Sequence, residues 1–456
     1  MKLKRTALLL VSAMMVGVTQ AQQPAERYTL KQVLQTAIDA NNSIIKAKYD
    51  YEEGAAKTKQ VKSAALPQVN VNADLSDNVI QQAFVFPKAF ADPSAGADDY
   101  MVLRAGMQYG LSTTASATQQ LFNKSVFTGI KAAKAGEEYY RNNIVRTEEE
   151  VILQTSNLFY QAASLEAQRA VIESNLEQTN RNLQITLDRF ENGLARKLDV
   201  DRLKVNATNL QTQLRTIDDT YSNVLNQLKI MMGMDVNTPL QIEEPLITVS
   251  STYAPNALLT ADEWAFENRI EYKQLQNQIH LYDLERQNYA AGYFPTLSAY
   301  ANYTYNGQSN QFFLSSESNP IWYDIASIGL KLSVPIFDGM NKSAQVQQSK
   351  IRKMKAERDL AFTKQQANME YLNALKSFET SYESYQAQKE NVQLANSVYD
   401  VTLENYNEGV SPLTDLLQAE TSKIQAQSQL IESLLKVKQA EVALLKSKGE
   451  IKNLLN

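Results

Sequence analysis

Cysteine is absent from the 456-residue sequence, so a disulfide framework and cysteine-based metal or redox sites are excluded. The only histidine, His280, lies in a polar helical segment, and we interpret it as a surface or packing residue. No glycine-rich phosphate loop follows a strand, and no Gly-x-Ser-x-Gly elbow occurs. We therefore predict that the protein is not an enzyme and has no cofactor, no metal site and no catalytic residue.

Long apolar runs and a positive charge balance are also missing. The formal net charge is -5, which argues against a nucleic-acid partner. Residues 1–21 combine a positive start, an apolar centre and a small-x-small site, which predicts a cleaved secretory signal peptide. No later stretch approaches the length of an apolar transmembrane helix, so we expect none.

The sequence repeats itself once. The stretch "LPQVNVNADLSDN" (66–78) resembles "FPTLSAYANYTYN" (294–306), and "RFENGLARKLDV" (189–200) resembles "NYNEGVSPLTDL" (405–416). These matches predict two copies of one unit, residues 22–233 and 258–456, joined by a connector over 234–257. Each copy reads as a helix, two strands, a long helix, a tip turn and a further helix.

Alternation of apolar and polar residues predicts the strands, near 69–75, 101–112, 296–305 and 326–334. Arg104 and Lys331 fall on the polar faces. Strands with one apolar and one polar face are typical of a membrane barrel. The same alternation is expected of a half-buried sheet in a soluble protein, so the pattern alone leaves both structures open.

The helical segments are much longer than those of globular proteins. Residues 124–189 contain no proline, and about 65 helical residues would extend roughly 100 Å. Apolar residues then recur at alternating spacings of three and four over 200–231, which indicates a coiled-coil seam. The corresponding helix after residue 412 carries two adjacent stripes, as expected of a helix that packs against a neighbour on each side in a ring.

In their order, these features resemble the TolC-type outer-membrane efflux proteins. The resemblance covers the duplicated strand–strand–helix plan, "VPIFDG" (334–339), and a glycine followed six residues later by aspartate, as in Gly193/Asp199 and Gly409/Asp415. It implies an α+β membrane protein in which a trimeric 12-stranded β-barrel is continued by a periplasmic α-helical barrel. The resemblance also implies a homotrimer in outer-membrane lipid, extending into the periplasm of a Gram-negative bacterium.

The resemblance further implies that the helix–turn–helix tips close the resting channel and contact a periplasmic adaptor protein. The matching residues are Gly193, Leu194, Asp199, Gly409, Val410, Ser411, Asp415 and Gln418. Asp415 matches an aspartate of the lumenal constriction, but Gln418 and Ser411 replace a second aspartate and a basic residue of the family pattern. Asp199 and Asp415 could instead stabilise the starts of their helices. Arg104 and Lys331 would face the barrel lumen.

The function implied is an exit duct that conducts substrates passively from an inner-membrane transporter to the outside, in tripartite efflux or type I secretion. The alternative is a structural or adhesive periplasmic coiled-coil protein with a small soluble sheet. The two hypotheses differ in whether the apolar strand faces contact lipid. The sequence leaves open the cargo, the pump, the adaptor and the number of copies, because two chains of four strands would also close a barrel, with eight strands.

Overall fold

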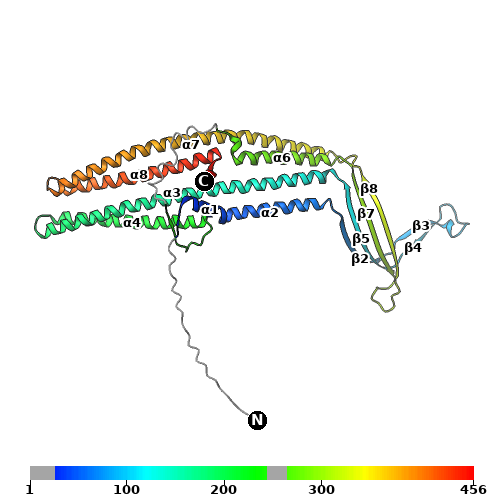
Figure 1. Cartoon of the computed structure of the whole chain (residues 1–456). Coiled ribbons are helices and arrows are strands. Elements are labelled where there is room, and N and C mark those ends of the chain that lie inside the picture. Colours follow the sequence, from blue (N-terminus) through cyan, green and yellow to red (C-terminus); the bar gives the residue numbers. More distant parts are fainter. Residues whose placement is uncertain (1–25, 244–263, 456) are drawn as a thin grey trace, which may run out of the picture.

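Two very long helices set the dimensions of the molecule (Figure 1). In this computed structural model, which describes residues 26–243 and 264–455, α3 (Lys124–Glu191) has 68 residues and α7 (Asn341–Asn407) has 67. Each therefore extends about 100 Å, as the sequence predicted. The predicted signal peptide and most of the predicted connector lie outside the described residues. Among the described residues, no helix is both long and apolar enough to cross a membrane.

Apart from α1, the main remaining elements recur in the same order in both halves of the chain. The first half contains α1 (Leu30–Ala40), α2 (Asn42–Ser63), β2 (Gln68–Asp77), β5 (Tyr109–Phe122) and α4 (Lys197–Met231). The second contains α6 (Ile270–Ala291), β7 (Thr296–Ser309), β8 (Ile321–Ser333) and α8 (Leu413–Lys448). Shorter elements are β1 (Glu26–Tyr28), β3 (Ala83–Pro87), β4 (Tyr100–Arg104), β6 (Leu240–Ile242), and the 3-10 turns η1 (Lys88–Phe90), η3 (Phe266–Asn268) and η4 (Ile451–Leu455).

The long helices each pack against a shorter helix at both ends. Toward the tips α3 packs on α4 and α7 on α8, and toward the strands α3 packs on α2 and α7 on α6. Contacts of α3 with α6 and α8 join the two halves. The predicted seams are confirmed, because most of their residues are buried, among them Val200, Leu203, Leu210, Ile217, Val224 and Leu228 in α4, and Leu416, Ala419, Ala426, Val437, Ala440 and Leu444 in α8.

Four antiparallel strands form one sheet in the order β2-β5-β7-β8. The register places polar residues opposite polar residues, as in the row Asn70, Ser116, Asn302 and Ser327, and apolar residues opposite apolar ones, as in the row Val69, Ala117, Ala301 and Ile328. The predicted two-faced character is therefore confirmed. Within the described residues β2 and β8 have no partner on their outer edges.

One strand prediction was wrong. The continuous strand expected over 101–112 is broken at Gly106, whose φ of 122° is open to glycine but strained for other residues. Residues 100–104 form β4, which pairs with β3 in a separate two-stranded ribbon, and the strand of the main sheet is β5, which starts at Tyr109. Arg104 therefore lies outside the four-stranded sheet, and its assignment to a barrel lumen is corrected.

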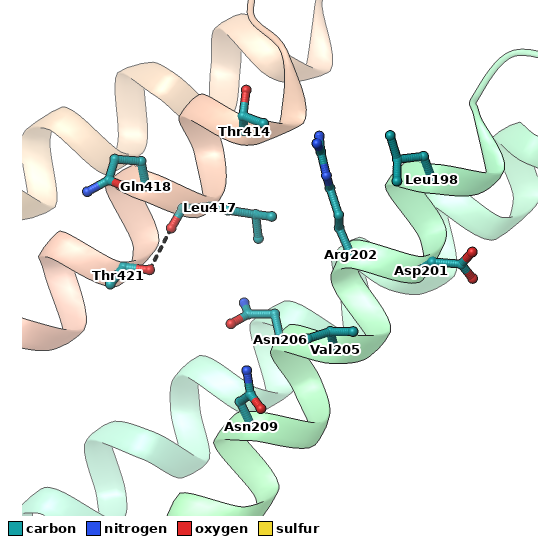
Figure 2. A pocket seen from close by; sticks show the side chains of 10 residues that line it. All are labelled: Leu198, Asp201, Arg202, Val205, Asn206, Asn209, Thr414, Leu417, Gln418 and Thr421. Atoms are coloured by element: carbon teal, nitrogen blue, oxygen red, sulfur yellow. Dashed lines mark hydrogen bonds between the residues drawn. The ribbon is translucent and has the colours of Figure 1, made fainter.

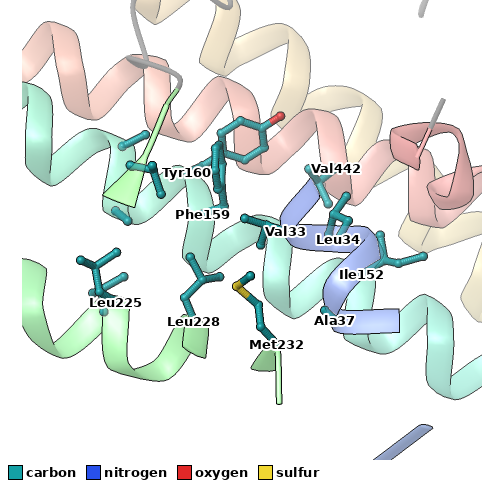
Figure 3. Close-up of a cluster of buried hydrophobic side chains, with 14 of the residues drawn as sticks. Val33, Leu34, Ala37, Ile152, Phe159, Tyr160, Leu225, Leu228, Met232 and Val442 are labelled. Atoms are coloured by element: carbon teal, nitrogen blue, oxygen red, sulfur yellow. The ribbon is translucent and has the colours of Figure 1, made fainter. Parts of the chain in front are cut away.

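The main hydrophobic core lies midway along the helices, at α1 (Figure 1), and combines side chains of α1, α3, α4 and α8 (Figure 3). Val33, Leu34 and Ala37 from α1 are fully buried there, beside Phe159 of α3. A capping box at Thr29 begins α1, and the short parallel pair β1–β6 lies beside this core. This core joins the chain's N-terminal and C-terminal elements to the middle of the long helices.

Candidate channel wall and its tips

Both helix–turn–helix tips are built by the same backbone motif. Gly193 and Gly409 adopt left-handed conformations with φ of 73° and 78°. At the first tip the amide of Leu194 donates to the carbonyl of Arg189, and at the second the amide of Val410 donates to that of Asn405. Together with bonds from the glycine amides, this is the Schellman arrangement that ends a helix. The glycines therefore reverse the chain at the far end from the strands (Figure 1).

The two aspartates that follow these glycines have different surroundings. Asp199 is buried in the first turn of α4, and its carboxylate is 3.0 Å from the Nε atom of Arg196. Asp415 is exposed in the first turn of α8, and its carboxylate accepts a hydrogen bond from the hydroxyl of Thr414. A helix-start role fits Asp199, whereas Asp415 is open to solvent and to any neighbouring copy.

A cleft of about 650 Å³ lies between α4 and α8 just behind the tips (Figure 2). Leu198 and Arg202 line it from α4, and Leu417 and Gln418 line it from α8. Figure 2 shows Leu417 pointing from α8 toward α4. Of the predicted tip residues only Gln418 lines this cleft. Asp199 and Asp415 lie outside it.

Farther from the tips, a buried carboxylate joins the two helical hairpins, α3–α4 and α7–α8. Glu420 of α8 is only 2% exposed. One of its oxygens accepts from the hydroxyl of Thr179 in α3, and the other accepts from the Nδ2 atom of Asn206 in α4 at 3.0 Å. Burial raises the pKa of Glu420, and these two hydrogen bonds and Lys423 oppose the shift.

Sequence analysis missed Glu420. Glu420 follows Ala419 of the predicted seam. A charged residue beside a seam of apolar and small residues is the pattern that could have indicated a buried carboxylate. Its partners Thr179 and Asn206 come from other helices, and their approach depends on the tertiary structure.

At the opposite end, one face of the sheet is polar and hollowed. Lys331 of β8 lines this concave face with Ser298, Tyr300 and Asn302 of β7 and with Thr118 of β5. The residues on either side of Lys331, Leu330 and Leu332, belong to the apolar rows and are 68% and 64% exposed. The single chain thus exposes an apolar sheet face that requires a cover.

Comparison with known proteins agrees with this architecture. A family model described as "Outer membrane efflux protein" matches residues 267–450. The outer membrane protein TolC of Salmonella enteritidis is 23% identical over 439 residues, covering 94% of this chain and 83% of the relative. A probable efflux pump outer membrane protein, TtgC of Pseudomonas putida, is 23% identical over 395 residues, covering 84% and 78%.

The fold is likewise shared with a solved structure. The crystal structure of the outer membrane protein VceC from Vibrio cholerae superposes with a TM-score of 0.70 at 17% identity, covering 92% of this chain and 96% of that one. The two-faced sheet at the end of long paired helices is thus the fold of the outer membrane protein VceC. Over residues 267–450 the chain matches the outer membrane efflux protein family, and over most of its length it is similar to TolC-type proteins of the outer membrane of Gram-negative bacteria, which is where we place it.

Proposed function

We propose that three copies of this chain form the exit duct of a tripartite efflux or type I secretion system. The observation that carries the proposal is the open, two-faced sheet. Strand β2 runs away from the helices and β8 runs back toward them, so β8 of one copy can pair antiparallel with β2 of the next. A closed barrel satisfies every backbone group in lipid, and three four-stranded sheets give 3 × 4 = 12 strands, an even number in the usual range.

In this assembly the apolar rows face lipid and the concave face with Lys331 faces the lumen. The helices continue the wall into the periplasm, where an adaptor and an inner-membrane transporter deliver the substrate. We also retain the division into two repeats, 22–233 and 258–456, as a proposal. In support, α2 and α6 start 270 − 42 = 228 residues apart, and α4 and α8 start 413 − 197 = 216 apart.

The tips are proposed as the adaptor contact. Leu194 and Val410 are 79% and 73% exposed although apolar, which is typical of a surface that a partner protein covers. Changing either residue to aspartate should lower the yield of cross-links to the adaptor and leave the protein folded. An unchanged yield from both variants would remove the tips from the adaptor interface.

Asp415 is proposed to line the constriction of the channel at the tips. Three exposed carboxylates around one axis would attract cations and repel one another, so Asp415→Ala should weaken block of the channel by divalent cations. Asp199→Ala serves as the matched control, because the Asp199 carboxylate is buried against Arg196 and should affect stability instead. Native mass measurement of the detergent-extracted protein should show three chains. Equal cation block in Asp415→Ala and the unmutated channel would show that Asp415 does not line the pore.

A further inference from the structure

The ribbon of β3 and β4 projects beyond the four-stranded sheet, at the end away from the helices (Figure 1). Its register pairs Phe84 with Leu103, Val85 with Val102 and Phe86 with Met101. Because neighbouring residues of a strand point to opposite faces, each face of the ribbon has an apolar centre. Phe84, Phe86, Met101 and Leu103 form one face, and Val85 and Val102 form the centre of the other, between the pairs Ala83–Arg104 and Pro87–Tyr100.

Nothing in the described part of the chain covers these faces. Val85 and Val102 are 63% and 64% exposed, and Phe84 and Leu103 are 41% and 48% exposed. A lone two-stranded ribbon is only marginally stable in water, and an exposed apolar surface of this kind marks a contact with a partner. The ribbon therefore needs a cover on both of its faces.

Lipid is a poor candidate for that cover. The outer edges of β3 and β4 carry unpaired backbone groups, which hydrocarbon cannot satisfy. The segment beyond the strands contains Lys88, Asp92, Asp98 and Asp99, all of them exposed, so inserting the ribbon tip into lipid would bury charge. A protein partner with its own apolar ribbon meets both requirements, because a neighbouring edge can pair with the free backbone groups.

We infer that the occupant is the same ribbon of a neighbouring copy of this chain, so that the ribbons pack together at the outer mouth of the assembled channel. The inference rests on the proposed trimer. In a ring of three, each ribbon has one neighbour on either side, which matches the presence of two apolar faces. The ribbon is also tethered at the right place, since it connects the outer ends of β2 and β5, and β2 is the edge strand that would meet the next copy.

The absence of native cysteine allows a direct test. In a ring each face of a ribbon meets the opposite face of the next copy, so the double variant Val85→Cys/Leu103→Cys, with one thiol on each face, should form a disulfide between copies under mild oxidation of the purified, detergent-extracted trimer. Leu314→Cys is the matched control, because Leu314 lies in the neighbouring loop between β7 and β8 and is 88% exposed. The control should remain uncrosslinked and should react freely with a maleimide.

Maleimide labelling keeps the test decisive if the geometry prevents disulfide formation. Cys at position 85 should react at least about tenfold more slowly than Cys at position 314 in intact trimers, and the difference should vanish when the trimers are dissociated. Intact trimers in which the double variant does not cross-link and position 85 is not protected would overturn the inference and leave the ribbon free for another partner. Absence of trimers in the unmutated protein would instead refute the proposed assembly.

Discussion

Replacement of Glu420 tests whether the tip half of the channel wall is held by one buried carboxylate. The change to alanine removes two hydrogen bonds to a charged group, one from Thr179 in α3 and one from Asn206 in α4. Each such bond contributes about 1.5–3 kcal/mol. Relief from burying the carboxylate offsets part of this loss, because burial alone disfavours the charged form. We expect a net loss of about 2 kcal/mol, which lowers the melting temperature by about 2 °C in a chain of this size.

The assay is thermal unfolding of the detergent-extracted protein, followed by circular dichroism at pH 5 and pH 8. Glu432→Ala is the matched control on the same helix, because the Glu432 side chain is 59% exposed and its ion pair with Lys436 is on the surface. Its cost should stay below about 0.5 kcal/mol. If Glu420→Ala melts at the same temperature as Glu432→Ala, Glu420 does not hold the hairpins together.

The direction of the pKa shift of Glu420 determines whether its contribution to stability rises or falls with pH. Burial raises the pKa of Glu420 above its ordinary value of 4.5, so its contribution to stability is fully present below that value. The contribution is lost as pH rises through the raised pKa. Lys423 and Tyr399 are the other titratable groups facing this site. Glu420→Gln should therefore show a smaller loss of stability between pH 5 and pH 8 than the unmutated protein. An identical loss would refute the reasoning.

Two further predictions concern the middle of the molecule. Gly233→Ala should cost about 3 kcal/mol, because a Cβ atom there would collide with the carbonyl of Ala40 and the φ of 66° strains other residues. Gly136→Ala is its control, since a Cβ atom meets no other atom there and alanine should stabilise α3 by about 1 kcal/mol. Equal melting temperatures of the two variants would contradict the collision at Gly233. Burial, assisted by Glu271, raises the pKa of Glu149 to about 7, so its stabilising contribution is lost as pH rises through about 7. Glu149→Gln should flatten the melting temperature between pH 6 and pH 8, and an unchanged pH profile would contradict that assignment.

The long helices, the tip turns and the two-faced sheet were predictable because local residue patterns determine them. Gly409 ends one helix and Pro412 immediately precedes the next, as the sequence indicated. The break at Gly106 was missed because period-two alternation continues on both sides of it, and no residue pattern reports a change of strand partner. The helix α7 begins at Asn341, directly after Gly339 and Met340, which both adopt left-handed conformations that a residue pattern does not report.

The site was less predictable than the fold. The family resemblance located the tips. Whether each aspartate is buried depends on nearby side chains, such as that of Arg196, which lies against Asp199. The polar contacts of Glu420 join three helices that lie far apart in the sequence.

Single-channel recording in planar lipid bilayers tests the central claim most directly. The purified protein should insert and give discrete conductance steps, and Lys331→Glu should shift the selectivity toward cations because the Lys331 side chain lines the polar face of the sheet. Failure to conduct, or a Lys331→Glu channel with unchanged selectivity, would contradict a lumen formed by that face.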